Sequence, residues 1–226
     1  RLKDETGTIT RTVYDIRGLV RQTWVGTCDF GATDQNPGSG AAGGNNMEMV
    51  SENVYDDGES GGNGYLTEII RKVDGGGTTN DRVEKRKYDY RGQLEEVKSS
   101  DGTREIAALY TYDNLGRVTE VLRYRGLLSA GHHLGKSVSH YDDDGRVYRT
   151  ETFGADEETG ALTEFPLVSN RWYDASGNVI KETGPNTQAA VKHVYDGVER
   201  NRARYVVLEG VHSGSGSGGD DSSSGG

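Results

Sequence analysis

Residues 101–126 have the sequence DGTREIAALYTYDNLGRVTEVLRYRG, and the centre of this stretch predicts a β-hairpin. Large and small side chains alternate on both sides of a four-residue break from Asp113 to Gly116. Asp is favoured at the first position of a type I turn, and Gly at the last position because it adopts positive φ freely. A type I turn followed by a left-handed Gly is a common hairpin connection, with the Gly as a bulge. This register places Tyr112 opposite Val118, a cross-strand pair of about 0.2–1 kcal/mol.

The Tyr-Asp pair of this hairpin recurs along the chain, which makes the hairpin a repeating unit. Its seven copies are Tyr14-Asp15, Tyr55-Asp56, Tyr88-Asp89, Tyr112-Asp113, Tyr141-Asp142, Tyr173-Asp174 and Tyr195-Asp196. Five copies carry Gly three residues after the Asp and an aliphatic residue two positions further on. The complete motif gives the predicted turn residues Tyr14, Asp15, Gly18, Tyr88, Asp89, Gly92, Tyr112, Asp113, Gly116, Tyr141, Asp142, Gly145, Tyr173, Asp174 and Gly177. Chance does not place so many copies in one chain of this size.

The spacing of the copies predicts about one hairpin per repeat. Successive Tyr-Asp pairs lie 22 to 41 residues apart, and the shortest intervals fit two strands with their turns. Insertions explain the longer intervals: a Gly- and Asn-rich loop at 26–46, a lengthened turn at 58–64 and an acidic excursion at 153–166. Segment 65–73 could be helical by its apolar spacing, but the flanking Gly and the Tyr-Asp turn favour a strand. We predict an all-β fold of tandem β-hairpins over residues 1–212.

Composition predicts a thin or extended sheet and excludes several partners. Hydrophobic residues make up 32% of the chain, and only its 34 Gly, which bury almost no surface, bring the apolar share to an ordinary level. Tyr, the commonest aromatic residue with 13 copies, suits half-buried strands. The net charge of −10 argues against a nucleic acid partner, because such binding needs a basic stripe. No apolar run is long enough to predict a membrane span.

The two ends of the chain differ from its middle. Residues 213–226, SGSGSGGDDSSSGG, contain no apolar side chain, so we predict a disordered tail there. The chain starts with Arg1, and no charged-then-apolar leader follows. We therefore expect it to be a section of a longer protein.

The recurrent polar residues have a structural and a functional interpretation. The repeated Asp residues could bind sugars or calcium, but the matching Gly residues favour a role as turn caps. The Tyr stripe could form a carbohydrate platform, or it could pack one strand pair on the next. Residues 142–145, DDDG, have the acidic start of a calcium loop, but position 12 falls on Phe153, where such a loop needs Glu.

The other reactive side chains predict no chemistry. His132 and His133 are adjacent, and adjacent strand residues point to opposite faces, so they would not bind one ion. Cys28 is the only Cys and reads as a small buried or half-buried side chain. The sequence has no G-x-S-x-G nucleophile elbow, since its one such string, GESGG at 58–62, lies in the lengthened turn. It has no H-E-x-x-H motif and no phosphate-binding Gly loop. We predict no catalytic residue, no cofactor and no metal, hence a non-enzymatic protein.

The motif resembles the YD repeat of Rhs-family proteins. Residues 110–118, YTYDNLGRV, with the preceding Asp101-Gly102, match it almost position for position, and residues 140–147, HYDDDGRV, match its second half. The likeness covers about residues 8–208. The family includes bacterial polymorphic toxins, shell components of insecticidal toxin complexes and teneurins. The chain departs from the family in having few repeats, no aspartyl self-cleavage motif and no candidate toxic domain.

The resemblance implies a fold, a function and partners. The hairpins would join into one ribbon that spirals into a hollow shell, and this chain would be a section of that wall, secreted or at the cell surface. Its partners would be neighbouring YD repeats and an encapsulated effector domain. The alternative is a cell-surface adhesion or carbohydrate-binding module that recognises a glycan through exposed Tyr residues and Trp24.

Overall fold

The computed structural model describes residues 1–40, 43–56, 64–73, 80–126, 132–185, 187 and 189–208. Within these residues the fold is all-β, and fifteen strands lie in one antiparallel sheet in strict chain order. The strands are β1 (Leu2–Lys3), β2 (Ile9–Tyr14), β3 (Val20–Gly26), β4 (Glu48–Tyr55), β5 (Leu66–Arg71), β6 (Arg82–Tyr88), β7 (Leu94–Ser100), β8 (Glu105–Tyr112), β9 (Val118–Arg125), β10 (His133–Tyr141), β11 (Val147–Phe153), β12 (Leu167–Tyr173), β13 (Val179–Thr183), β14 (Ala189–Tyr195) and β15 (Asn201–Leu208). The predicted fold class is confirmed, and segment 65–73 contains the strand β5.

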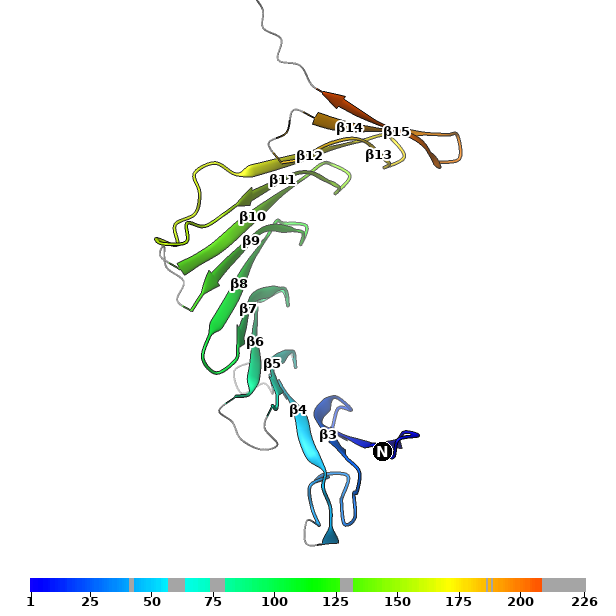
Figure 1. Cartoon of the computed structure of the whole chain (residues 1–226), viewed down its shortest axis with the longest axis vertical. Coiled ribbons are helices and arrows are strands. Elements are labelled where there is room, and N and C mark those ends of the chain that lie inside the picture. Colours follow the sequence, from blue (N-terminus) through cyan, green and yellow to red (C-terminus); the bar gives the residue numbers. More distant parts are fainter. Residues whose placement is uncertain are drawn as a thin grey trace, which may run out of the picture. The chain divides into compact units, whose positions relative to one another are not determined.

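The chain divides into two units, which are described separately. Residues 1–139 and 151–166 form the first unit, and residues 140–150 and 167–226 form the second. In the first unit the hairpins follow one another along the sheet, and Figure 1 shows the β6–β7 and β8–β9 turns on one edge and the β7–β8 turn on the other.

Every Tyr-Asp pair lies at the end of an even-numbered strand, in the turn to the next strand. In an antiparallel sheet of consecutive strands, alternate turns share an edge, so the Tyr-Asp turns of each unit lie along one edge. The insertions at 26–46 and 153–166 connect β3 to β4 and β11 to β12, on the opposite edge. The lengthened turn at 58–64 belongs to the Tyr-Asp edge, and its residues 57–63 fall outside the described residues, as do 213–226 of the tail.

Besides the predicted bulge at Gly116, the register of the β8–β9 hairpin contains a second bulge that the sequence does not predict. Tyr112 lies opposite Val118, as predicted, but Thr111 lies opposite Glu120, so Thr119 is an extra residue. The same shift occurs in the hairpins β2–β3, β4–β5, β6–β7, β12–β13 and β14–β15. A bulge leaves one residue out of the ladder and increases the local twist of the strand.

The sheet buries few apolar side chains. Among the described residues the buried apolar side chains are Ile9, Val13, Met47, Ala107, Tyr124 and Ala190. Most strand positions are half-buried, as expected of a thin sheet that has no thick second layer to cover it. Loop 26–46 also packs on the sheet, because Pro37 is fully buried and a Cβ on Gly38 would lie 2.8 Å from the Trp24 ring.

Candidate functional site

The most regular polar feature of the molecule is the row of Tyr-Asp turns, and each turn is closed by its Asp. In the β8–β9 turn the Gly116 N–H donates to the Asp113 carbonyl (3.1 Å), and the Asp113 N–H donates to the Arg117 carbonyl (3.0 Å). Gly116 has a φ of 81°, the left-handed conformation that favours Gly. This is a type I turn followed by a left-handed residue.

The Asp side chain accepts hydrogen bonds from the backbone of its own turn. Asp113 Oδ1 accepts the backbone N–H of Leu115 (2.9 Å) and of Arg117 (3.0 Å), while Oδ2 accepts Arg117 Nε (2.6 Å). The carboxylates of Asp15, Asp89, Asp142, Asp174 and Asp196 accept the same two backbone N–H groups, two and four residues further on. The structure thus places these carboxylates in the turns, with their oxygens already bonded to the chain itself.

These hydrogen bonds also change the acidity of the carboxylates. The backbone N–H of Arg117 lowers the pKa of Asp113, and the Arg117 side chain and the Leu115 N–H add to this effect. The pKa values of Asp174 and Asp196 are lowered for the same reason, by the N–H groups of Asn178 and Arg200. Hydrogen bonds to the charged form of an acid favour that form. Each of these three carboxylates therefore stays charged in its turn to a lower pH than a free one.

In five of the seven turns the Tyr side chain links the turn to the hairpin before it. The Tyr112 hydroxyl donates to the carbonyl of Leu94 (2.8 Å), which begins the second strand of the preceding hairpin. The same bond runs from Tyr55 to Val20, Tyr88 to Leu66, Tyr173 to Val147 and Tyr195 to Val179, at 2.7 to 3.1 Å. The acceptors Val20, Leu66, Leu94 and Val179 each lie directly beside the bulge of their own hairpin. The Tyr stripe is thus a ladder of inter-hairpin hydrogen bonds.

A second contact runs between neighbouring turns. The side chain after the Gly of one turn lies over the Gly of the next: Gln93 Nε2 would be 2.9 Å from a Cβ on Gly116, and Tyr65 would overlap a Cβ on Gly92. Arg146 reaches from its own turn to the Asp174 carbonyl (3.3 Å), with its guanidinium 4.9 Å from the centre of the Tyr173 ring. The glycines at these positions provide both positive φ and room for the neighbouring turn.

One turn outside the seven Tyr-Asp copies has the same geometry, and the last of the copies has it without Gly. Asp4 and Gly7, between β1 and β2, make the same backbone bonds although Lys3 stands in the place of Tyr, and Gly7 has a φ of 89°. In the β14–β15 turn the position of Gly is taken by Glu199, with a φ of 63°, the one positive-φ residue other than Gly in the described part of the chain. The signal for the Asp4 turn is Asp followed by Gly three positions later, without the Tyr.

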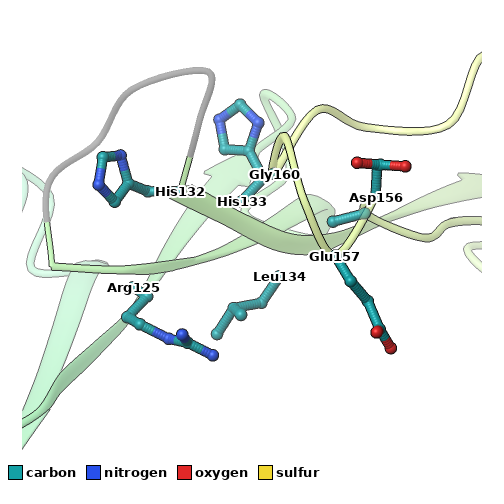
Figure 2. A pocket seen from close by; sticks show the side chains of 8 residues that line it. Arg125, His132, His133, Leu134, Asp156, Glu157 and Gly160 are labelled. Carbon is teal, nitrogen blue, oxygen red and sulfur yellow. The ribbon is translucent and has the colours of Figure 1, made fainter.

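The residues considered for metal binding do not come together. His132 and His133 lie at a cavity of about 500 Å³ with Arg125 and the acidic loop at Asp156 and Glu157. Figure 2 shows the Glu157 carboxylate pointing away from both imidazoles. Asp156 Oδ1 accepts the Thr159 N–H and hydroxyl, which lower the pKa of Asp156. Within the described ranges no group of three or more His, Cys, Asp or Glu side chains could hold a metal ion.

The remaining single candidates occupy structural positions. Cys28 is half-buried in loop 26–46, where Asn46 Oδ1 accepts its backbone N–H (2.7 Å). Trp24 is half-buried, and its indole N–H donates to Gln22 (3.2 Å). His140 and His193 lie in strands β10 and β14. Among the residues that the structure describes, no helix is long and apolar enough to cross a membrane.

Comparison with known proteins identifies the fold. No protein-family model and no curated protein matches the sequence. A crystal structure of TcdB2-TccC3-Cdc42 matches 88% of this chain with a TM-score of 0.55 and 15% identity. A structure of TcdB2-TccC3 without its hypervariable C-terminal region matches the same share with a TM-score of 0.55 and 14% identity. These are Rhs/YD-repeat shell proteins, and this chain has the fold of their repeats. It spans 9% of the length of either one.

Proposed function

We propose that this chain is a non-enzymatic section of the wall of an Rhs/YD-repeat protein. The complete wall encloses or presents a toxin or effector domain outside the cell. The observation that carries the proposal is the Tyr ladder, in which successive turns are bonded to their predecessors through Tyr hydroxyls. A wall built from one ribbon needs such bonds, because strand pairing alone leaves the turns free to move.

The chemistry of the turns supports a mechanical role. Their Asp carboxylates, the most repeated reactive groups of the sequence, are held by backbone N–H groups, and four of the turns add an Arg side chain at 2.6 to 2.8 Å. The likeness to structural shell repeats points in the same direction. Adjacent YD repeats are the partners that this proposal requires, together with an enclosed polypeptide.

The proposal is tested on the product of the complete reading frame that contains these residues. Cryo-electron microscopy is expected to show the ribbon continuing into a closed wall around additional protein density. Limited proteolysis is expected to spare the enclosed part until the wall is unfolded with denaturant. A ribbon with solvent on both faces, and no protected fragment, would contradict the proposal.

A glycan-binding surface is the second candidate, and one observation favours it. Tyr148 and Trp172 are each 42% exposed and lie at a cavity of about 360 Å³ in the second unit, together with Asn170 and Arg171. Exposed rings beside polar groups suit a sugar. Lys181 Nζ lies 4.4 Å from the centre of the Trp172 ring and occupies one of its faces. A glycan array probed with the chain and with Trp172→Ala separates the two candidates, and an array without any binding rejects this one.

A further inference from the structure

Two arginines face each other across the β5–β6 pair in the first unit. Arg71 and Arg82 are direct cross-strand partners, so their side chains extend from the same face of the sheet. Both are exposed. Like charges directly opposite each other destabilise a sheet. In the part of the chain that the structure describes, no ion pair joins either guanidinium to a carboxylate.

A third arginine completes a pocket around this pair. Asp101 donates its N–H to the carbonyl of Arg104 (3.2 Å), which closes the tight turn between β7 and β8. Arg104 lies with Arg71 and Arg82 around a cavity of about 360 Å³. The cavity is also lined by Val83, Glu84, Ser99, Ser100, Asp101 and Ile106. Three arginines from three separate segments therefore line one concavity.

The two carboxylates at this pocket are already engaged. Glu84 Oε1 accepts Arg86 Nε (2.7 Å) and lies 2.6 Å from Arg86 Nη2. Asp101 Oδ1 accepts the N–H of Arg104 (2.7 Å) and of Thr103 (3.0 Å). Three Arg against Glu84 and Asp101 leave the lining with a net charge of +1, or +2 when Arg86 is included. This local excess of positive charge stands out in a chain with a net charge of −10.

The pocket also offers a neutral donor. Ser100 Oγ accepts the N–H of Gly102 (3.1 Å), so its own proton is left to donate to a ligand. Val83 and Ile106 form apolar walls, and Ile106 is 50% exposed. A polar group that entered the pocket would find donors on several sides and an apolar surface beside them.

We infer that this pocket binds a phosphate or sulfate group, as the free ion or carried on a larger molecule. Guanidinium groups bind such oxyanions through paired, charge-assisted hydrogen bonds. A group with a charge near −2 offsets both charges of the Arg71–Arg82 pair at once, which a single carboxylate does not. The site is independent of the enclosure proposed above, because it uses a local cluster and not the Tyr ladder.

The test compares the 226-residue chain with Arg82→Gln and with Arg21→Gln as the matched control. Arg21 is exposed on β3 and loses the same charge when it is changed. The probes are sodium phosphate and sodium sulfate against sodium chloride at equal ionic strength. Thermal unfolding measures stability, and NMR of the Arg Nε–Hε groups measures binding. The control is needed because sulfate and phosphate also stabilise proteins in general.

Inorganic phosphate is expected to shift the Nε–Hε signals of Arg71, Arg82 and Arg104 and to raise the Tm of the chain and of Arg21→Gln alike. Arg82→Gln is expected to bind phosphate at least about tenfold more weakly, and its Tm in chloride should not fall, because a like-charge contact is removed. Equal responses of all three proteins, or no binding of either ion, overturn the inference. Arg104→Gln, outside the strands, serves if Arg82→Gln does not fold.

A sulfated disaccharide distinguishes the two sources of the group. Tighter binding than inorganic sulfate, with competition between them, assigns a group carried on a larger molecule. Binding of the inorganic ions alone assigns a free ion. Both results support the site, and both require that Arg82→Gln abolishes the effect.

Discussion

The hydroxyl of Tyr112 donates a hydrogen bond to the carbonyl of Leu94, 2.8 Å away in the preceding hairpin. Burial raises the pKa of Tyr112, so the phenol keeps its proton, and with it this bond, beyond the pH at which a free Tyr ionises. The bond joins a residue at the end of one hairpin to the bulge of another. The same bond in five turns explains why Tyr, and not Phe, precedes the Asp there.

The left-handed position of each turn predicts opposite effects for two substitutions. Glu199 adopts a φ of 63° where other turns have Gly, and this conformation costs a residue with a side chain about 1–2 kcal/mol. We expect Glu199→Gly to stabilise the chain by about 0.5–1 kcal/mol, since the greater freedom of unfolded Gly offsets part of the gain. Gly116→Ala should destabilise it by about 1 kcal/mol or more. Urea unfolding measures both, and a destabilised Glu199→Gly would show that this turn differs from the others.

The turn carboxylates predict a loss of stability in acid. The folded chain lowers the pKa of Asp113 from 3.8. A lowered pKa contributes stability that is present above the unfolded pKa and is lost as the pH falls through the folded one. We expect the unfolding free energy of Asp113→Asn to depend less on pH below about 4 than that of the parent chain. Asp143→Asn, an exposed neighbour in an equivalent turn, is the control, and an identical pH profile for Asp113→Asn would reject the capping role.

A buried ion pair between Lys72 and Asp81 predicts a large loss of stability when the lysine is replaced. Lys72 Nζ lies 2.6 Å from Asp81 Oδ2, and these side chains are 12% and 5% exposed. Asp81 Oδ1 has no hydrogen-bond partner, so Lys72 is the group that balances a buried charge. Lys72→Met should cost about 3–5 kcal/mol, because it leaves that charge unpaired.

The matched control for this change is an exposed ion pair of similar length. Lys87 lies 2.8 Å from Glu95 with its side chain 66% exposed. Lys87→Met should cost less than about 1 kcal/mol. Equal costs for the two variants in urea unfolding would contradict the claim that Lys72 balances a buried charge.

The sequence predicted the parts of the fold that are set by local chemistry. Asp113 and Gly116 determine a turn within four residues, and the alternation around them determines two strands, so the all-β hairpin ribbon follows directly. The Asp4–Gly7 turn was not predicted because Lys3 stands where the motif has Tyr. The positive φ of Glu199 was not predicted because a residue with a side chain rarely adopts that conformation.

The contacts between hairpins could not be predicted in this way. The partner of the Tyr112 hydroxyl depends on the register of β7 against β8 and on a bulge at the start of β7. The residues around Tyr112 in the sequence indicate neither of them. The same holds for loop 26–46: its Gly-rich composition indicates a loop, but the burial of Pro37 depends on where Trp24 lies. The Arg71–Arg82 pair likewise exists only in the folded register.

The measurement that tests the ladder most directly compares Tyr112→Phe with Tyr14→Phe. Both Tyr residues precede the Asp of a turn, but Tyr14 is 53% exposed, belongs to the first of the seven copies and has no hydroxyl partner in the described part of the chain. Urea unfolding at neutral pH should show a loss of about 0.5–1.5 kcal/mol for Tyr112→Phe and no loss for Tyr14→Phe. Equal stabilities of the two variants would contradict the claim that Tyr hydroxyls hold successive hairpins together.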